Sequence, residues 1–135
     1  MKKYSIDNFF TQSLNAAGSK LPLTLPDGTE TGEYLVVMGY HADEAVECRE
    51  AGRLASEQLD HDLKDFDEGS KEYVNLQEYG LTEIHTSLAR ELVFDWSFGD
   101  FDQDTLDRLL AENKGTLPFA ITAHAANAEN FLKKK

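Results

Sequence analysis

The sequence is poor in cysteine, in positive charge and in long apolar runs. Cys48 is the single cysteine among 135 residues, so it cannot form an internal disulfide, and a lone thiol is typical of a reducing compartment. We interpret Cys48 as a small buried apolar residue. The longest apolar run, Leu35 to Met38, is far too short to cross a bilayer, and no signal-peptide pattern follows Met1. We therefore expect a soluble protein with no membrane partner.

Positive charge is scarce compared with negative charge. The chain has 13 lysines and arginines against 25 aspartates and glutamates, which gives a formal net charge of -12. From His41 to Glu112 there are 20 acidic residues and 6 basic ones. Binding to a phosphate backbone needs clustered lysine and arginine. We therefore predict no nucleic-acid partner, and a charged middle that attracts basic or polar partners.

The sequence has no recognisable catalytic or metal-binding motif. Asp100, Asp102 and Asp104 resemble the opening of a calcium loop, but Thr105 and Ala111 stand where such a loop needs glycine and glutamate. We interpret the aspartates as caps of a helix. The histidines lack the paired spacing of a zinc site: they are His41, His61, His85 and His124. We expect no metal, no cofactor and no enzymatic activity.

The length and a hydrophobic content of 41% predict a single domain over residues 1–135. Its first local signal is a β-hairpin over about residues 21–39. Apolar residues alternate at its start, and Pro26-Asp27-Gly28 is typical of a turn. Pro22 predicts an edge strand, because proline cannot donate to a ladder. Gly28 and Gly32 fit positive φ angles in the loop.

The helical part covers about residues 42–133 and should contain about four helices, which makes the predicted fold class α+β, mainly α. The first helix should end near Gly69. Its apolar positions are mostly small, so that a second helix or a second copy can approach closely. These positions form a candidate helix-contact seam: Ala45, Cys48, Gly52, Ala55 and Leu59, with Phe66 beyond them.

Three further helices are expected towards the C-terminal end. The second should begin at Thr82 as its N-cap and continue through Trp96 to Gly99. The third should run from Asp102 or Asp104 through Leu110, and the fourth from Thr116 to Leu132 with Pro118 in its first turn. A short helix is also predicted near the N-terminus, over residues 6–14. The aromatic cluster Phe94, Trp96, Phe98 and Phe101 is interpreted as core.

The order of these features resembles the tail assembly chaperones of long-tailed, siphovirus-type bacteriophages, over about Leu21 to Phe131. The matching N-terminal features are the hairpin with its Pro26-Asp27-Gly28 turn, Met38-Gly39-Tyr40 and the alanine-rich helix. The matching C-terminal features are Phe94-Asp95-Trp96, Phe101, Leu106 to Leu110, Asn113, and the ending Ala126-Asn127-Ala128-Glu129-Asn130-Phe131. No residue of this pattern is catalytic.

The resemblance implies a protein that binds the tape measure protein, keeps it soluble and helps to recruit tail tube subunits. It also implies action in the host cytoplasm and absence from the mature virion. A longer form made by ribosomal frameshifting is a further hypothesis, because codons for Lys133 to Lys135 can form a slippery run. We also expect a homo-oligomer, a ring or spiral around the client. Two alternatives remain: an acidic DNA-mimic inhibitor of a nucleic-acid-binding protein, and a structural tail or connector component.

Overall fold

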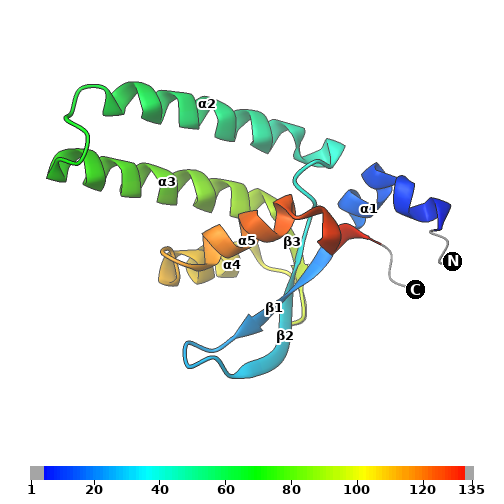
Figure 1. Cartoon of the computed structure of the whole chain (residues 1–135). Helices are drawn as coiled ribbons and strands as arrows, with labels where there is room; N and C mark the ends of the chain where they lie inside the picture. The colour runs from blue at the N-terminus through cyan, green and yellow to red at the C-terminus, as the bar shows by residue number, and fades with distance from the viewer. Residues whose placement is uncertain (1–4, 133–135) are drawn as a thin grey trace, which may run out of the picture.

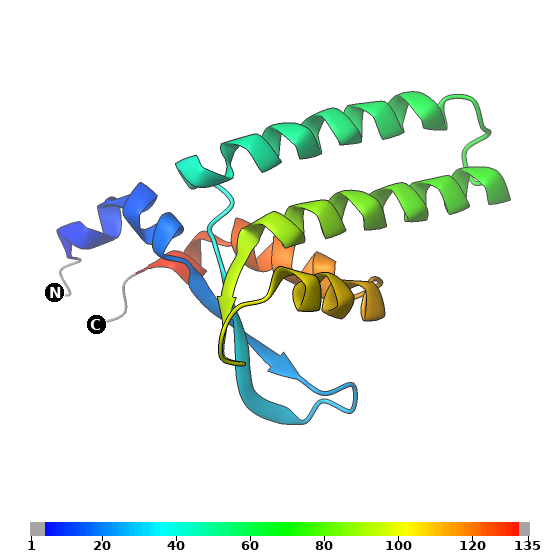
Figure 2. The same cartoon turned by 180° about the vertical axis from the view of Figure 1, so that it is seen from behind.

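The computed structural model describes residues 5–132, and it combines a small antiparallel sheet with a long helical pair (Figures 1 and 2). The fold class is therefore α+β, mainly α, as predicted. The elements follow one another as η1 (Ile6–Phe9), α1 (Thr11–Ala17), β1 (Ser19–Thr24), β2 (Glu30–Val37), η2 (Asp43–Ala45), α2 (Val46–Leu63), α3 (Lys71–Leu92), β3 (Val93–Trp96), α4 (Gln103–Glu112), α5 (Leu117–Ala126) and η3 (Ala128–Phe131).

The predicted hairpin is formed by β1 and β2. Asp27 stabilises its turn by accepting a hydrogen bond from the Thr29 amide at 2.9 Å, and Gly28 and Gly32 have positive φ angles of 88° and 77°. The sheet order β1-β2-β3 makes β1 an outer strand, so the edge position predicted for Pro22 is confirmed. The hairpin tip lies on the side of the molecule away from the α2–α3 pair (Figure 1).

The long helical pair consists of α2 and α3, which lie side by side and antiparallel (Figure 1). The start predicted for the second of these helices, Thr82, is wrong. The helix begins eleven residues earlier, at Lys71, where the Ser70 hydroxyl accepts a hydrogen bond from the Tyr73 amide at 3.2 Å. Thr82 instead donates its hydroxyl hydrogen to the Glu78 carbonyl at 2.8 Å. The Thr82 hydroxyl therefore bonds within the helix and does not cap the start of one.

The end predicted for this helix is also wrong, because Trp96 lies in a strand. Val93, the C-cap of α3, has the extended angles φ -83° and ψ 122°. The next residues pair with the hairpin, Asp95 opposite Val36 and Trp96 opposite Leu35. Steps of four placed Trp96 on the helical face, but Val93, Phe94 and Trp96 are residue types that favour strands. The hydrogen bonds of β2 decide the outcome.

Both predicted terminal helices are shorter or more broken than expected. The N-terminal one divides at Phe10 into η1 and α1, and α1 extends to Ala17. The last helix ends at Ala126 instead of Leu132. Asn127 ends it, because its extended backbone and its side chain, which accepts from the Glu129 amide at 3.1 Å, start a separate 3-10 turn. Lys133 to Lys135 lie outside the described residues.

The aspartate-rich segment before α4 acts as a cap, as predicted. The Asp102 carboxylate accepts hydrogen bonds from the amide of Thr105, at 3.1 Å, and from the Thr105 hydroxyl. Pro118 lies in the first turn of α5, also as predicted.

The core lies where β2 and β3 meet α3, α4 and α5. Leu35 in the central strand, Leu92, Leu106, Leu110 and Ile121 are fully buried. Trp96 is buried, and its ring packs against Phe101 with centroids 4.9 Å apart. The aromatic cluster is only partly core, because Phe94 and Phe98 are exposed. The body of the protein is thus built around the sheet, and the outer half of the α2–α3 pair extends beyond it (Figure 2).

His124 links the C-terminal turn η3 to strand β1 of the sheet through its two ring nitrogens. Its Nε2 lies 3.1 Å from the Ser19 hydroxyl, and its Nδ1 lies 3.1 Å from the Asn130 side-chain nitrogen. That nitrogen also donates to the His124 carbonyl at 3.0 Å, so a neutral Nδ1 accepts the second amide hydrogen. Partial burial lowers the pKa of His124 below its ordinary value of 6.5. Protonation of Nδ1 would place its N–H donor opposite the N–H donor of the Asn130 side chain.

This arrangement predicts a pH dependence of stability. Because the folded pKa is lowered, the stabilisation is fully present above about pH 6.5 and is lost as pH falls below it. We expect the free energy of unfolding, measured by urea denaturation, to fall between about pH 7.5 and 5.5. The variant His124→Gln should show a smaller fall than a control with exposed His61 replaced by glutamine. Equal falls in the two variants would contradict this role of His124.

Candidate helix-binding groove

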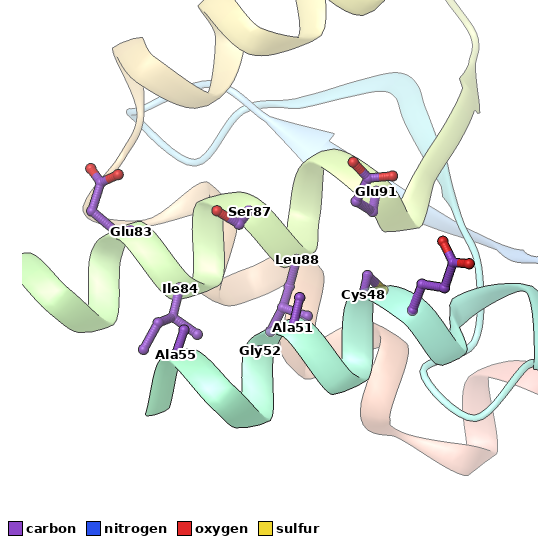
Figure 3. Close-up of a pocket in the computed structure, with 10 residues that line it drawn as sticks. Cys48, Ala51, Gly52, Ala55, Glu83, Ile84, Ser87, Leu88 and Glu91 are labelled. Carbon is purple, nitrogen blue, oxygen red and sulfur yellow. The ribbon is translucent and has the colours of Figure 1, made fainter. Parts of the chain in front are cut away.

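A groove of about 550 Å³ lies between α2 and α3 on one face of the helical pair (Figure 3). Its floor is apolar or small, and its margins carry glutamates. The α2 side consists of Glu47, Cys48, Ala51, Gly52 and Ala55, and the α3 side of Glu83, Ile84, Ser87, Leu88 and Glu91. The groove is open, since Ala51 and Ala55 remain exposed at its floor.

Two glycines bring α2 and α3 together, Gly52 at the groove and Gly80 elsewhere along the pair. A Cβ atom on Gly52 of α2 would lie 3.2 Å from a methyl group of Leu88, and one on Gly80 of α3 would lie 2.5 Å from a methyl group of Leu59. The missing side chain of each glycine therefore leaves room for a leucine of the opposite helix. This close approach explains glycine inside a helix, where it costs up to about 1 kcal/mol relative to alanine.

The tighter of these contacts leads to a stability prediction. Substituting Gly80→Val places branched carbon atoms where the Leu59 side chain packs, so we expect a loss of about 1–3 kcal/mol in the free energy of unfolding. Thermal denaturation followed by circular dichroism measures the effect. The control Gln77→Val makes the same change to valine at an exposed position of α3. If both variants unfold at the same temperature, close packing at Gly80 is not the cause.

The structure brings together three of the five predicted seam residues at the groove: Cys48, Gly52 and Ala55. Ala45 lies in the 3-10 turn before α2 and is buried in the core. Leu59 is buried against Gly80. Phe66 lies past the end of α2 and is exposed. The spacing of small residues in α2 was visible in the sequence. The α3 side lies within the helix predicted from Thr82, but nothing in the sequence indicated that this helix packs against α2.

The electrostatics of the groove are one-sided. Its lining contains Glu47, Glu83 and Glu91 and no lysine or arginine. The nearest guanidinium on α3, that of Arg90, bonds Asp107 of α4 at 2.7 Å and reaches the Glu91 carboxylate only at 3.7 Å. An exposed ion pair of that length contributes little. The margins therefore favour a ligand with positive charge beside its apolar surface.

Cys48 is part of the groove but is not activated as a nucleophile. Burial, followed by the negative charge of Glu91, raises the pKa of its thiol. Its sulfur atom donates a hydrogen bond to the Ala45 carbonyl at 3.2 Å. Its surroundings therefore suit packing more than covalent chemistry. Within the part of the chain that the structure describes, no three histidine, cysteine or acidic residues are grouped to hold a metal ion.

A second, wider groove lies between the hairpin and helices α4 and α5. It measures about 910 Å³, and its lining is mostly apolar: Leu21, Leu23, Leu25, Phe98, Leu109 and Leu117, among others. This groove was not predicted, because it forms between segments about 90 residues apart in the sequence. Among residues 5–132, no helix is long and apolar enough to cross a membrane.

Comparisons with family models, with curated proteins and with solved structures find no match to this chain.

Proposed function

We propose that this protein is a phage tail assembly chaperone that binds a helical segment of the tape measure protein in the α2–α3 groove. The observation that carries the proposal is the groove itself, with its small apolar floor and three glutamates. Amphipathic helices are commonly bound in such apolar grooves between two helices. The likeness of the sequence to tail assembly chaperones supplies the identity of the client.

The rest of the helical pair supports a role in binding. Six of the thirteen exposed large hydrophobic side chains among the described residues belong to α2, α3 and their connecting loop: Val46, Leu54, Phe66, Val74, Tyr79 and Leu81. The same segment, residues 46–92, carries 12 acidic and 5 basic residues. Its charge would keep a complex dispersed while apolar side chains contact the client.

Co-expression with the tape measure protein of the same phage tests the proposal. We expect the client to be insoluble alone and soluble with this chain, and the two to co-purify with several copies of the chaperone per client. Light scattering of the purified complex gives that ratio. A client that stays insoluble and unbound would overturn the proposal.

The proposal also places the protein in the assembly process. As an assembly factor it acts in the host cytoplasm, helps to recruit the tail tube protein and leaves before the virion is complete. Mass spectrometry of purified virions distinguishes it from a structural tail or connector component, which would remain in the particle. A frameshifted longer form would supply the contact with the tube protein, and reporter translation of the native message measures whether that form is made.

A further inference from the structure

Glu91, at one margin of the α2–α3 groove, lies where its negative charge does not favour the fold. It is the last residue but one of α3, and a helix has the negative pole of its dipole at that end. A positive side chain such as that of Arg90 is favourable there, whereas a carboxylate is not. The Glu91 side chain is 59% exposed, so water reduces the cost without removing it. The charge of Glu91 therefore has no explanation in the folding of α3.

The positive charges of the helical pair do not neutralise the glutamates of the groove. Each of the three arginines on α2 and α3 is bonded away from the groove: Arg49 to two backbone carbonyls, Arg53 to two glutamates of α2, and Arg90 to an aspartate of α4. Arg90 also approaches the Glu91 carboxylate, but only to 3.7 Å. Within residues 5–132, Glu47 and Glu83 form no ion pair. The negative charge of the groove is therefore available to a ligand.

The three glutamates are divided between the two ends of the groove. Glu91 and Glu47 lie at the end that contains Cys48, where burial and, after it, the negative charge of Glu91 raise the pKa of the thiol. Glu83 lies at the other end, beside Ala55 (Figure 3). It precedes Glu91 by eight residues, or about 12 Å along the helix. The small, apolar floor between these ends therefore has the length of about two helical turns.

We infer that Glu91 and Glu47 determine which client binds, and that the groove takes an amphipathic helix with lysine or arginine at both ends of a two-turn apolar face. A helix fits because both walls are helices, and the small residues between them leave room for large apolar side chains of a third helix. The client is basic because a neutral one would cover these carboxylates without supplying a cation. The inference rests on the proposed function and adds the chemistry that the site recognises.

The variant Glu91→Gln should change stability and binding in opposite directions. Removing the charge relieves the unfavourable interaction at the end of α3, so we expect the midpoint of thermal unfolding of the free protein to rise by about 1–3 °C. The same variant should bind a basic helix about fivefold more weakly at low ionic strength, and added salt should reduce the difference. Circular dichroism measures the first effect and fluorescence anisotropy the second.

The probes are two labelled synthetic peptides that differ only in charge. Both are helical peptides of about 18 residues with leucines at i, i+3, i+4 and i+7, and the positions that flank this face are either lysine or glutamine. We expect the full chain to bind the lysine peptide at least about tenfold more tightly than the glutamine peptide. Equal affinities, or no binding of the lysine peptide, would overturn the inference.

Glu112→Gln is the matched control, because Glu112 is exposed in the last turn of α4 and lies outside the groove. It removes the same charge from the same kind of helix end, so it should raise the unfolding midpoint in the same way and leave peptide affinity unchanged. Glu47→Gln removes a charge from the first turn of α2, where it is favourable, and should lower both the midpoint and the affinity. If Glu112→Gln weakens binding as much as Glu91→Gln, the effect is one of overall charge and the inference fails.

The two peptides also separate this inference from the proposed function. If the native chain solubilises the tape measure protein but binds the two peptides equally, the proposed function stands and the inference is wrong. If the lysine peptide binds selectively through Glu91 while the tape measure protein stays insoluble and unbound, the groove has the inferred chemistry and the proposed function is wrong.

Discussion

The double variant Ala51→Arg, Ala55→Arg is expected to abolish solubilisation of the tape measure protein. Both alanines are exposed at the floor of the groove on the same side of α2. Arginine is a good helix former, so the fold should tolerate both changes. In the complex, however, the new side chains fill the groove and place positive charge where a basic helix would bind. We expect a loss of at least about 2 kcal/mol, or roughly 30-fold in Kd.

The control for this prediction adds the same charge to the same fold. Ser56→Arg on α2 and Ala111→Arg on α4 both alter exposed positions outside the groove. This double variant should solubilise the client as the native chain does. Pull-down and sedimentation of the co-expressed client distinguish the two. If the control loses binding equally, the effect arises from overall charge and the groove is not the binding site.

Trp96→Ala is expected to cause the largest loss of stability, about 3–5 kcal/mol. Trp96 is buried at the end of β3, and its ring contacts Phe98 and Phe101 with centroids 5.7 and 4.9 Å apart. Its indole nitrogen also donates to the Asp100 carbonyl at 3.3 Å. Removing the ring leaves a cavity between the sheet and the segment that leads into α4. Since small domains are stable by only about 5–15 kcal/mol, partial unfolding near physiological temperature is expected.

Chemical denaturation followed by circular dichroism measures this loss. The matched aromatic control is Tyr79→Ala, because Tyr79 is largely exposed on the outer half of α3. Its cost should stay within about 0.5 kcal/mol. A Trp96→Ala protein that unfolds at the same denaturant concentration as this control would show that the ring does not stabilise the core.

The local signals of the sequence were sufficient for the hairpin and for the Asp102 cap, but not for the start of α3, where Ser70 and not Thr82 is the cap. Alternation of leucines and the turn residues predicted β1, Pro22 predicted its edge position, and Asp102 was identified as a helix cap. Each of these features depends on residues within a few positions of one another, so the local chemistry determines it. The groove itself was not predictable in full, because half of its lining comes from α3.

The errors have a common physical origin in long-range contacts. Residues 71–81 have a weak apolar pattern, and they are helical because the Ser70 cap starts a helix that packs against α2. Val93 to Trp96 continue a helical spacing, yet β2 offers them a ladder of hydrogen bonds and the core takes the indole ring. Tertiary partners override local propensity in both places.

By itself, the sequence determined the acidic charge, the single thiol, the hairpin turn, the Asp102 cap and the spacing of small residues in α2, because these are properties of residue types and near neighbours. Only the tertiary structure decided which residues of α3 pack against these small residues. Gly80 of α3 leaves room for Leu59, and Gly52 of α2 leaves room for Leu88. The two helices therefore approach closely, and on one face of the pair they form a groove with an apolar floor and glutamates at its margins. The physical reason is that a groove needs two surfaces, here those of α2 and α3, and which helix packs against α2 depends on the packing of the whole chain.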